Sequence, residues 1–574
     1  MDKKITKFII ELISPFRIRI LVITICMIAV SFLSILYPML QRVLFDDGIT
    51  HGNMKTVIHY TGLIMCIYIV EQILSYIQFG CYQIINKQIS FKLMYQAVEH
   101  SIKLKMSYHK DNNFLKIIGN VQSDVTSISQ IVNNGLLQII LSFFKITGGI
   151  IGLCIIDWRL TLFVLTIAPF EMISKNFISS KKQNYFKNYM KINEKFSIWF
   201  GEIFKSIEVI KLWNLQSKRM EEFELLKKEL INCEKKMEYS DNYANISSQT
   251  LGMIFTHGVN LLGAMLITHN QLTIGGLFAF ISYSSYVLQP VSILTNLIYR
   301  LKASIPAFKR YMEYFDNEIE CEEGISLNDI GKGIENIVFD NVVFGYDDKK
   351  PIFRTINMSI SKGEKVGFIG KNGSGKSTII SLLLRFFETT SGTIKLNGID
   401  IQNIALSEYR SLFCVMNQNI SLFDDTIKNN INILDNLSED EISYYLNLAT
   451  ATEFVEDLPM GVDSLVGFNG GKISGGERQK IALARALAKR GNILILDEAT
   501  ANFDLVAETK FNQYLMECCL YDIIIVISHR EDILKRLDNI FYIDNGVIVD
   551  SGSFDELMER HNNLYQILTQ EDKV

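Results

Sequence analysis

The sequence predicts an α-helical membrane domain followed by a soluble α/β domain of the phosphate-loop type. Long apolar runs crowd residues 1–310 of the 574-residue chain, and the remainder alternates in polarity like a soluble domain. A glycine-rich loop at Gly370–Thr378 separates an apolar run typical of a buried strand from a run typical of a helix. We therefore divide the chain into a membrane domain at 1–310, a linker at 311–335 and a soluble domain at 336–574.

The membrane domain is expected to cross the bilayer six times, because a spanning helix needs about 20 predominantly apolar residues. The segments that qualify are 18–44, 57–84, 136–156, 160–178, 251–267 and 272–293. Lysines concentrate in the two long stretches at 85–135 and 179–250, whereas the outer turns contain only Lys55 and Arg159. The positive-inside rule therefore places both termini, these two stretches and the soluble domain in the cytoplasm of a multi-pass cell-membrane protein.

Charge and spacing extend this prediction beyond the spans. The two long stretches are charged and periodic rather than rich in glycine and proline, so we expect helices that continue from the membrane into water. Upstream of the first span, apolar residues recur at helical spacing among lysines, which predicts an amphipathic helix on the membrane surface.

Composition excludes several other classes of protein. The formal charge of -5 argues against a nucleic-acid partner. The nine cysteines include no Cys-x-x-Cys pair and no histidine at metal-ligand spacing, so we expect reduced cysteines without metal. The abundance of lysine, isoleucine and asparagine favours a bacterial source.

The loop at Gly370–Thr378 has the composition of a phosphate-binding site. Its glycines let successive backbone N–H groups turn toward an anion, and the following helix adds a partial positive charge at its N-terminus. Lys376 would reach the terminal phosphates of ATP, and the Ser377 hydroxyl would bind Mg²⁺. The ATP-binding residues that we predict in this loop are Gly370, Asn372, Gly373, Ser374, Gly375, Lys376, Ser377 and Thr378.

Two further apolar runs complete a predicted ATPase site. The run at 493–496 precedes Asp497 and Glu498, of which the first would hold Mg²⁺ and the second would orient or deprotonate the attacking water. The run at 523–527 precedes His529, which would contact the γ-phosphate. Tyr346, about thirty residues before the phosphate lysine, could stack on the nucleotide base.

At this point the sequence resembles the ATP-binding cassette (ABC) superfamily, because Ile473–Lys480 is similar to the cassette signature. The resemblance implies that Ser474, Gly475, Gly476 and Glu477 close over the ATP that the opposite cassette holds. It also identifies Gln418 with the glutamine loop, which senses Mg²⁺, and Asp504 with the aspartate loop that crosses the dimer.

The six spans before the cassette resemble an exporter-type half-transporter, so the likeness covers nearly the whole chain. It implies short coupling helices around His109–Ile117 and Lys211–Ser217 that dock on the cassettes. One chain has one phosphate loop and one signature, whereas each ATP needs both, so the working unit is a dimer. All site residues are of catalytic type, which favours a homodimer, with a heterodimer as the alternative.

Three residues depart from the family pattern. In the signature, Ile473 and Glu477 stand where the family often has Leu and Gln, and both changes keep Ser474-Gly475-Gly476, so the phosphate contact should survive. Exporters usually carry a glutamate within a Val-Gly-Glu-x-Gly run just upstream of the signature, and here Phe468 follows Val466 and Gly467. An apolar ring in place of a charge puts in doubt any coupling by an ion pair at this position.

Ionisable residues within the spans are the candidates for a substrate cavity. They are Glu71, Lys145, Glu171 and His257. A cavity with both signs of charge suits an amphipathic substrate such as a peptide, drug or lipid, which makes an ATP-driven exporter the favoured function. Side chains near a span end could instead snorkel to the interface. An importer with the exporter fold, and a cassette-gated channel or regulatory sensor, stay open as alternatives.

Overall fold

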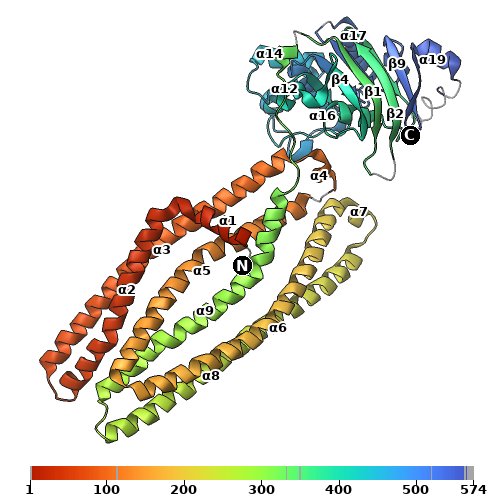
Figure 1. Cartoon of the computed structure of the whole chain (residues 1–574). Helices are drawn as coiled ribbons and strands as arrows, with labels where there is room; N and C mark the ends of the chain where they lie inside the picture. The colour runs from red at the N-terminus through yellow and green to blue at the C-terminus, as the bar shows by residue number, and fades with distance from the viewer. Residues whose placement is uncertain are drawn as a thin grey trace. The chain divides into compact units, whose positions relative to one another are not determined.

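The computed structural model describes residues 3–111, 114–330, 333–347, 351–518, 520–561 and 564. Contacts divide the chain into two compact units (Figure 1). The first comprises Met1–Leu104 and Tyr108–Ile319, and the second comprises Lys105–Ser107 and Glu320–Val574. A helical membrane unit followed by an α/β unit confirms the predicted fold class.

Within the described residues, the membrane unit contains one long helix for each predicted span. These helices are α2 (Arg17–Val43), α3 (Met54–Lys103), α5 (Phe114–Ile156), α6 (Trp158–Lys205), α8 (Gln216–Thr268) and α9 (Ile274–Phe315). Each of these helices except α2 is much longer than its apolar segment, either beginning well before it or ending well after it. This extension agrees with the helices expected from the charged, periodic stretches. Three described helical segments, Lys7–Ile49, Met54–Lys103 and Gln216–Thr268, are long and apolar enough to cross a membrane, and Leu141–Ile156 is a shorter apolar segment.

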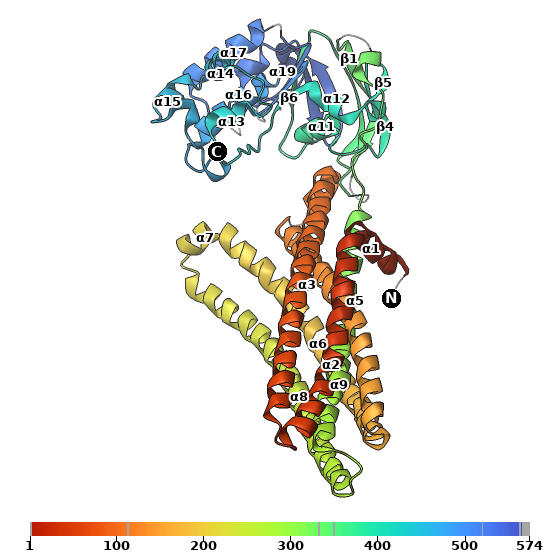
Figure 2. The same ribbon diagram turned by 90° about the vertical axis from the view of Figure 1, so that its left-hand side faces the viewer.

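The long helices associate in pairs. α5 packs along α9, α2 packs along α3, and α6 runs beside α8 in both views of the structure (Figures 1 and 2). Glycines of α5 allow the close approach to α9, since a Cβ atom at Gly152 would lie 2.6 Å from the Tyr283 ring. The Tyr283 hydroxyl donates to the Ile35 carbonyl of α2 at 2.6 Å, which joins a third helix to this packing.

The predicted amphipathic helix is present as α1 (Lys3–Ile13), and its apolar face packs on α9. Ile9 and Leu12 are buried there, and the Phe8 ring contacts the rings of Phe308 and Tyr311 at centroid distances of 6.3 and 6.0 Å. Aromatic and aliphatic contacts thus cover the C-terminal end of α9.

Two short helices lie where the resemblance implied coupling helices, with shifted bounds. α4 spans Met106–Asp111 and α7 spans Ile207–Leu212. The predicted ranges, His109–Ile117 and Lys211–Ser217, overlap them only at one end, and residues 112 and 113 lie outside the described part of the chain.

The soluble unit is built on a ten-stranded sheet in the order β5-β4-β1-β2-β10-β9-β3-β8-β7-β6. The strands β9, β3, β8, β7 and β6 run parallel and are nearly continuous apolar runs, because helices cover both of their faces. The strand bounds are β1 Asn336–Phe344, β2 Phe353–Ser361, β3 Lys365–Ile369, β4 Ser391–Leu396, β5 Ile399–Asp400, β6 Phe413–Met416, β7 Ile493–Asp497, β8 Ile523–Ile527, β9 Asn539–Asp544 and β10 Val547–Gly552.

Helices flank this sheet and form a separate helical portion between β6 and β7. The helix that follows the glycine-rich loop is α11 (Lys376–Leu383), and the helix that follows the signature is α16 (Gly475–Ala488). The others are α10 Leu327–Ile330, α12 Leu406–Ser411, α13 Ile427–Ile431, α14 Glu439–Leu448, α15 Thr452–Glu456, α17 Leu505–Glu517, α18 Glu531–Leu534 and α19 Phe554–Arg560.

The segment expected to be a linker is more ordered than its composition suggested. α9 continues past residue 310 to Phe315, and the chain joins the soluble unit from Glu320 onward. Ile325 donates to the Asn403 carbonyl at 2.7 Å, and its own carbonyl accepts from the Ala405 N–H at 3.0 Å. Backbone pairing therefore attaches the second half of this segment to the soluble unit.

Candidate nucleotide site

The glycine-rich loop lies between β3 and α11, as the sequence predicted, and two of its glycines are required by geometry. Gly370 has φ 154° and Gly375 has φ 106°, conformations that other residues rarely adopt. A Cβ atom at Gly370 would lie 2.2 Å from the Ile543 carbonyl oxygen, and one at Gly375 would lie 2.5 Å from the Phe353 ring. The loop can therefore hold this shape only with glycine at both positions.

Polar groups of the loop point into its concave side. The Lys376 side chain is buried, and its ammonium donates to the Gly370 carbonyl at 2.6 Å and to the Lys371 carbonyl at 3.3 Å. The Ser374 hydroxyl is buried and has no hydrogen-bond partner among the described residues. A buried ammonium and an unsatisfied hydroxyl in one loop fit an anionic ligand such as a phosphate chain.

Two carboxylates stand beside this loop at the end of β7. Asp497 accepts a hydrogen bond from the Ser377 hydroxyl, and Gln418 donates to a Glu498 carboxylate oxygen at 2.9 Å. Burial raises the pKa of Asp497, the Glu498 charge raises it further, and Ser377 and Lys376 act in the opposite direction. Three parts of the sequence that lie far apart, at Ser377, Gln418 and Asp497–Glu498, thus meet beside the loop.

The donor set at this point matches a hard cation. Ser377, Gln418 and Asp497 offer a hydroxyl, an amide oxygen and a carboxylate, which are ligands that Mg²⁺ prefers. Among the described residues, no group of three or more His, Cys, Asp or Glu side chains is placed to hold a metal ion.

Tyr346 occupies the rim of the loop. Its hydroxyl lies 3.4 Å from the Thr378 hydroxyl, and its ring meets the Phe344 and Phe387 rings edge to face at 5.0 and 4.9 Å. The side chain is 43% exposed, so one ring face is open to a ligand. Packing against two phenylalanines fixes the ring, as a stacking platform for a base requires.

The signature serine begins α16, and the substituted residue Glu477 has a structural use. The Ser474 hydroxyl accepts from the Glu477 N–H at 3.3 Å, and the Glu477 carboxylate accepts from the Ser474 N–H at 2.7 Å. This capping box satisfies two otherwise unpaired N–H groups. Gly475 and Gly476 form the first turn of the helix.

The remaining predicted residues lie in loops of the soluble unit. Asp504 begins α17 and accepts from the Ala507 N–H at 2.8 Å, a bond that, with the charge of Lys480, lowers the pKa of Asp504. His529 follows β8, and both of its ring nitrogens are buried. Phe468, upstream of the signature, is 87% exposed.

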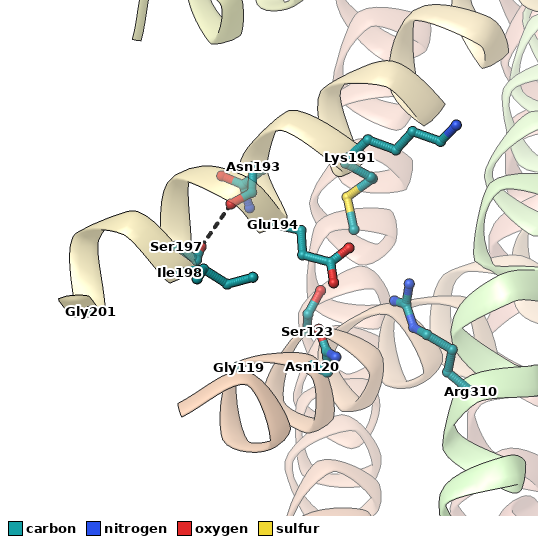
Figure 3. Close-up of a pocket in the computed structure, with 11 residues that line it drawn as sticks. Gly119, Asn120, Ser123, Lys191, Asn193, Glu194, Ser197, Ile198, Gly201 and Arg310 are labelled. Carbon is teal, nitrogen blue, oxygen red and sulfur yellow. Dashed lines mark hydrogen bonds between the residues drawn. The ribbon is translucent and has the colours of Figure 1, made fainter. Parts of the chain in front are cut away.

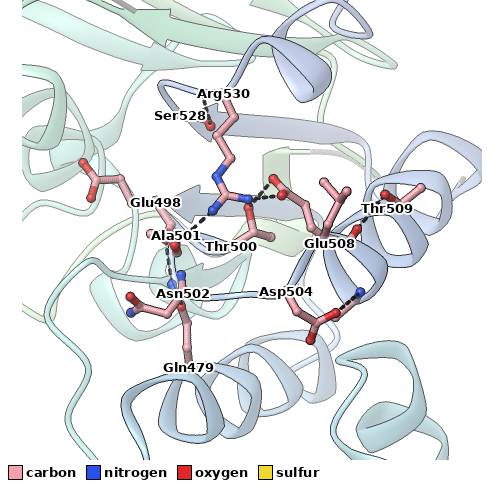
Figure 4. Close-up of polar contacts among 12 residues, drawn as sticks. Gln479, Glu498, Thr500, Ala501, Asn502, Asp504, Glu508, Thr509, Ser528 and Arg530 are labelled. Carbon is pink, nitrogen blue, oxygen red and sulfur yellow. Dashed lines mark hydrogen bonds and ion pairs between the residues drawn. The ribbon is translucent and has the colours of Figure 1, made fainter. Parts of the chain in front are cut away.

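Sequence reasoning missed a polar network that joins these loops (Figure 4). Gln479 of α16 donates to the Glu498 carbonyl at 2.8 Å and accepts from the Asn502 N–H at 2.9 Å. Arg530 forms an ion pair with the buried Glu508 and donates to the Ala501 carbonyl at 3.0 Å. The signal was present in the sequence as polar residues inside or beside the motifs, but no short-range pattern indicated what they contact.

Of the four cavity candidates in the spans, two interact electrostatically. The charges of Glu71 on α3 and Lys145 on α5 attract each other. His257 on α8 is exposed, and the Glu171 side chain lies outside the described part of the chain.

A separate polar cavity of about 300 Å³ lies between α5, α6 and α9, beyond the apolar segments of these helices (Figure 3). Glu194 of α6 and Arg310 of α9 point into it, and Ser123 of α5 lines its floor. Arg310 donates through two nitrogens to the buried Asp124. Burial raises the pKa of Asp124, and Arg310 partly offsets that rise.

Long apolar helices joined to a phosphate-loop domain with paired carboxylates define a membrane-spanning ATPase. The family described as ABC transporter transmembrane region matches residues 20–291, and the family described as ABC transporter matches residues 353–501. The chain belongs to the ABC transporters, as a half-transporter with one membrane domain and one ATPase domain. It hydrolyses ATP in a reaction coupled to transmembrane transport.

Relatives and a solved structure agree with this assignment. The chain is 29% identical over 486 residues to an ATP-dependent lipid A-core flippase of Alcanivorax borkumensis, covering 84% of this chain and 82% of the relative. It is 25% identical to the Escherichia coli K12 protein of the same description, covering 96% and 95%. A bacterial Atm1-family ABC exporter with ATP bound has the same fold, with a TM-score of 0.85, 21% identity, and coverage of 97% and 99%.

Proposed function

We propose that the protein is a homodimeric exporter that uses ATP to move a lipid-like amphipath from the cytoplasmic leaflet outward. This proposal rests on one observation, which is an ATPase site in a chain with the fold of an exporter. The residues that form this site are Lys376, Ser377, Gln418, Asp497 and Glu498. The names of the relatives support a lipid as the cargo. The bacterial relatives support an inner membrane of a bacterium. The lysine distribution supports an orientation with both termini in the cytoplasm.

A dimer is needed because Ser474 and the phosphate loop belong to the same soluble unit but serve different ATP molecules. In the family to which the chain belongs, the signature of one copy closes over the ATP of the other. All motif residues here are of catalytic type, which supports two equivalent sites. The exposed apolar residues Leu212 and Trp213, at 78% and 74%, would dock α7 on the soluble domain of the second copy.

The chemistry follows from the residues beside the loop. Lys376 and the loop N–H groups would bind the β- and γ-phosphates, and Glu498 would orient and deprotonate the attacking water. A bound Mg²⁺, held by Ser377, Gln418 and Asp497, would neutralise charge that develops on the phosphates. Gln418 contacts Glu498 directly, so a movement of its loop would displace the catalytic carboxylate. His529 would hold the γ-phosphate.

The motor is tested by ATPase assays on the purified protein in lipid, beside Glu498→Gln. The variant keeps the size and the hydrogen bonds of the side chain but loses the base, so it should bind ATP and hydrolyse at least about a hundredfold more slowly. An equal rate for both proteins would remove Glu498 from the catalytic role.

Direction and cargo are tested by transport. Inside-out vesicles that contain the protein should accumulate a fluorescent phospholipid analogue in their lumenal leaflet when ATP is added, and Glu498→Gln vesicles should not. Movement in the opposite direction would identify an importer. ATP-dependent conductance without accumulation would identify a channel.

A further inference from the structure

The backbone of Glu498, the residue proposed to activate water, is strained. Its φ angle is 52°, in the left-handed region that a residue with a side chain rarely adopts. Such a conformation persists only where the surrounding contacts hold it, and residues of this kind cluster at functional sites. The contacts of the loop that follows β7 therefore bear on the direction in which the Glu498 carboxylate points.

Backbone bonds hold Glu498 at the start of this loop. Its N–H donates to the Ile527 carbonyl at the end of β8 at 3.0 Å, and its carbonyl accepts from the Ala501 N–H at 3.2 Å. The Gln479 amide donates to the same carbonyl at 2.8 Å. Two of these bonds anchor Glu498 to β8 and α16, and the third makes its conformation depend on where Ala501 lies.

A buried carboxylate fixes the next part of the loop (Figure 4). Glu508 of α17 is 4% exposed, accepts from the Thr500 hydroxyl at 3.3 Å and forms an ion pair with Arg530. Arg530 also donates to the Ala501 carbonyl at 3.0 Å. The pair of Glu508 and Arg530 thus contacts two consecutive residues of the loop, two and three positions after Glu498.

The same pair reaches the loop that carries His529. Arg530 directly follows His529, and its backbone N–H donates to the Ser528 hydroxyl oxygen at 3.1 Å. The ion pair is costly to break, because Glu508 would then remain buried without a counter-charge. It is therefore a firm connection between the loop of Glu498 and the loop of His529.

We propose that Glu508 and Arg530 are positioning residues for ATP hydrolysis, which hold Glu498 in its left-handed conformation and so aim its carboxylate at the attacking water. Their effect lies in the rate of the chemical step rather than in ATP binding, because their bonds are to the loop of Glu498 and not to the phosphate loop. This inference rests on the proposed role of Glu498 and deepens it.

The first test is Glu508→Gln, which keeps the size of the side chain and removes its charge. In the full-length protein in lipid nanodiscs, the variant should lower kcat about 10- to 100-fold and leave the KM for ATP within about twofold of its original value. Glu517→Gln makes the same chemical change at the exposed end of α17 and should leave both constants unchanged. A raised KM with kcat intact would overturn the assignment.

A second background distinguishes positioning from a general loss of structure. If Glu508 acts through Glu498, its substitution should cost little in a chain that already carries Glu498→Gln. Single-turnover hydrolysis of radiolabelled ATP should then give about the same rate for the double variant as for Glu498→Gln alone. A merely structural role would lower the rate in both backgrounds, so a further fall of about tenfold in the double variant refutes the inference.

The outcomes separate this inference from the function on which it rests. If Glu498→Gln slows hydrolysis and Glu508→Gln does not, the positioning role is wrong and the ATPase assignment stands. If Glu498→Gln hydrolyses ATP at the unmodified rate, both assignments are wrong. If Glu508→Gln does not fold, Arg530→Lys is measured instead, because an ammonium does not reproduce the planar contact of a guanidinium with Glu508 and Ala501. An unmodified kcat in that variant again refutes the inference.

Discussion

Glu320 accepts hydrogen bonds from both terminal nitrogens of Arg410, at 2.6 and 2.8 Å. The same guanidinium donates to the carbonyls of Leu384 at 3.1 Å and Arg385 at 3.0 Å, directly after α11. These bonds connect the segment that follows α9 to the C-terminal end of α11, the helix that begins at Lys376. A displacement of this segment would therefore act directly on the end of α11.

Arg410→Lys should weaken this connection, because an ammonium cannot make the bidentate contact and both backbone bonds at once. Both partners are largely shielded from solvent, so we expect a loss of about 1 to 3 kcal/mol in unfolding free energy, measured by denaturation. Basal ATPase activity should persist while its stimulation by amphipaths falls. Stimulation equal to that of the unmodified protein would show that the connection carries no signal.

Gln479→Leu should slow hydrolysis without weakening ATP binding. The Gln479 amide holds the backbone of Glu498 and Asn502, so its loss should displace the catalytic carboxylate slightly. We expect kcat to fall about 10- to 100-fold with little change in KM. A rise in KM with kcat intact would instead place Gln479 in nucleotide binding.

Tyr346→Ala should raise the KM for ATP about tenfold, since stacking of a base on an aromatic ring contributes about 1 to 3 kcal/mol. Tyr346→Phe keeps the ring between Phe344 and Phe387 and should restore nearly all of the affinity. The comparison of KM for ATP in the two variants separates ring stacking from the contact with Thr378. Equal losses in both would indicate that the hydroxyl is what matters.

Arg310→Met should make stability depend on pH through Asp124. Burial raises the folded-state pKa of Asp124, so the fold favours the protonated carboxyl, and this contribution is lost as pH rises through the folded pKa. Without Arg310 the pKa should rise further, and the unpaired carboxylate should cost about 3 to 5 kcal/mol at pH 7. Thermal unfolding should therefore show a larger deficit at pH 7 than at pH 5.

The matched control is the double variant Arg310→Met with Asp124→Asn. It has no carboxylate to titrate, so its unfolding temperature relative to the unmodified protein should change much less between pH 5 and pH 7. Glu194 also faces Arg310, and its charge is present in all of these proteins. A deficit in Arg310→Met that is independent of pH would contradict the role of Asp124.

A feature could be predicted from the sequence when the residues that form it lie close together along the chain. The loop at Gly370–Thr378 was predictable, because its function resides in consecutive backbone groups. The carboxylates at the end of β7 followed from the apolar run of four residues at 493–496 that precedes them. By contrast, Gln479 contacts Glu498 and Asn502, which lie 19 and 23 residues further along the chain, and no local periodicity predicts these contacts.

The membrane unit shows the same limit. Charges such as Glu71 and Lys145 stood out singly within apolar runs, but their electrostatic interaction depends on how α3 packs against α5. The offset of α7 from the range Lys211–Ser217 has a local cause. Asn214 takes φ 52°, a left-handed conformation that interrupts the helix, and the charged spacing on either side does not mark this break.

The contact of α1 with α9 has a consequence for biosynthesis. Phe8 leaves the ribosome before Phe308 by 300 residues of synthesis, which takes roughly 15 to 60 s at about 5 to 20 residues per second. During that interval the apolar face of α1 lacks its aromatic partners on α9, and the bilayer interface is the nearest apolar phase. The amphipathic character of α1 therefore serves the nascent chain first, and the finished protein then uses the same face to close over α9.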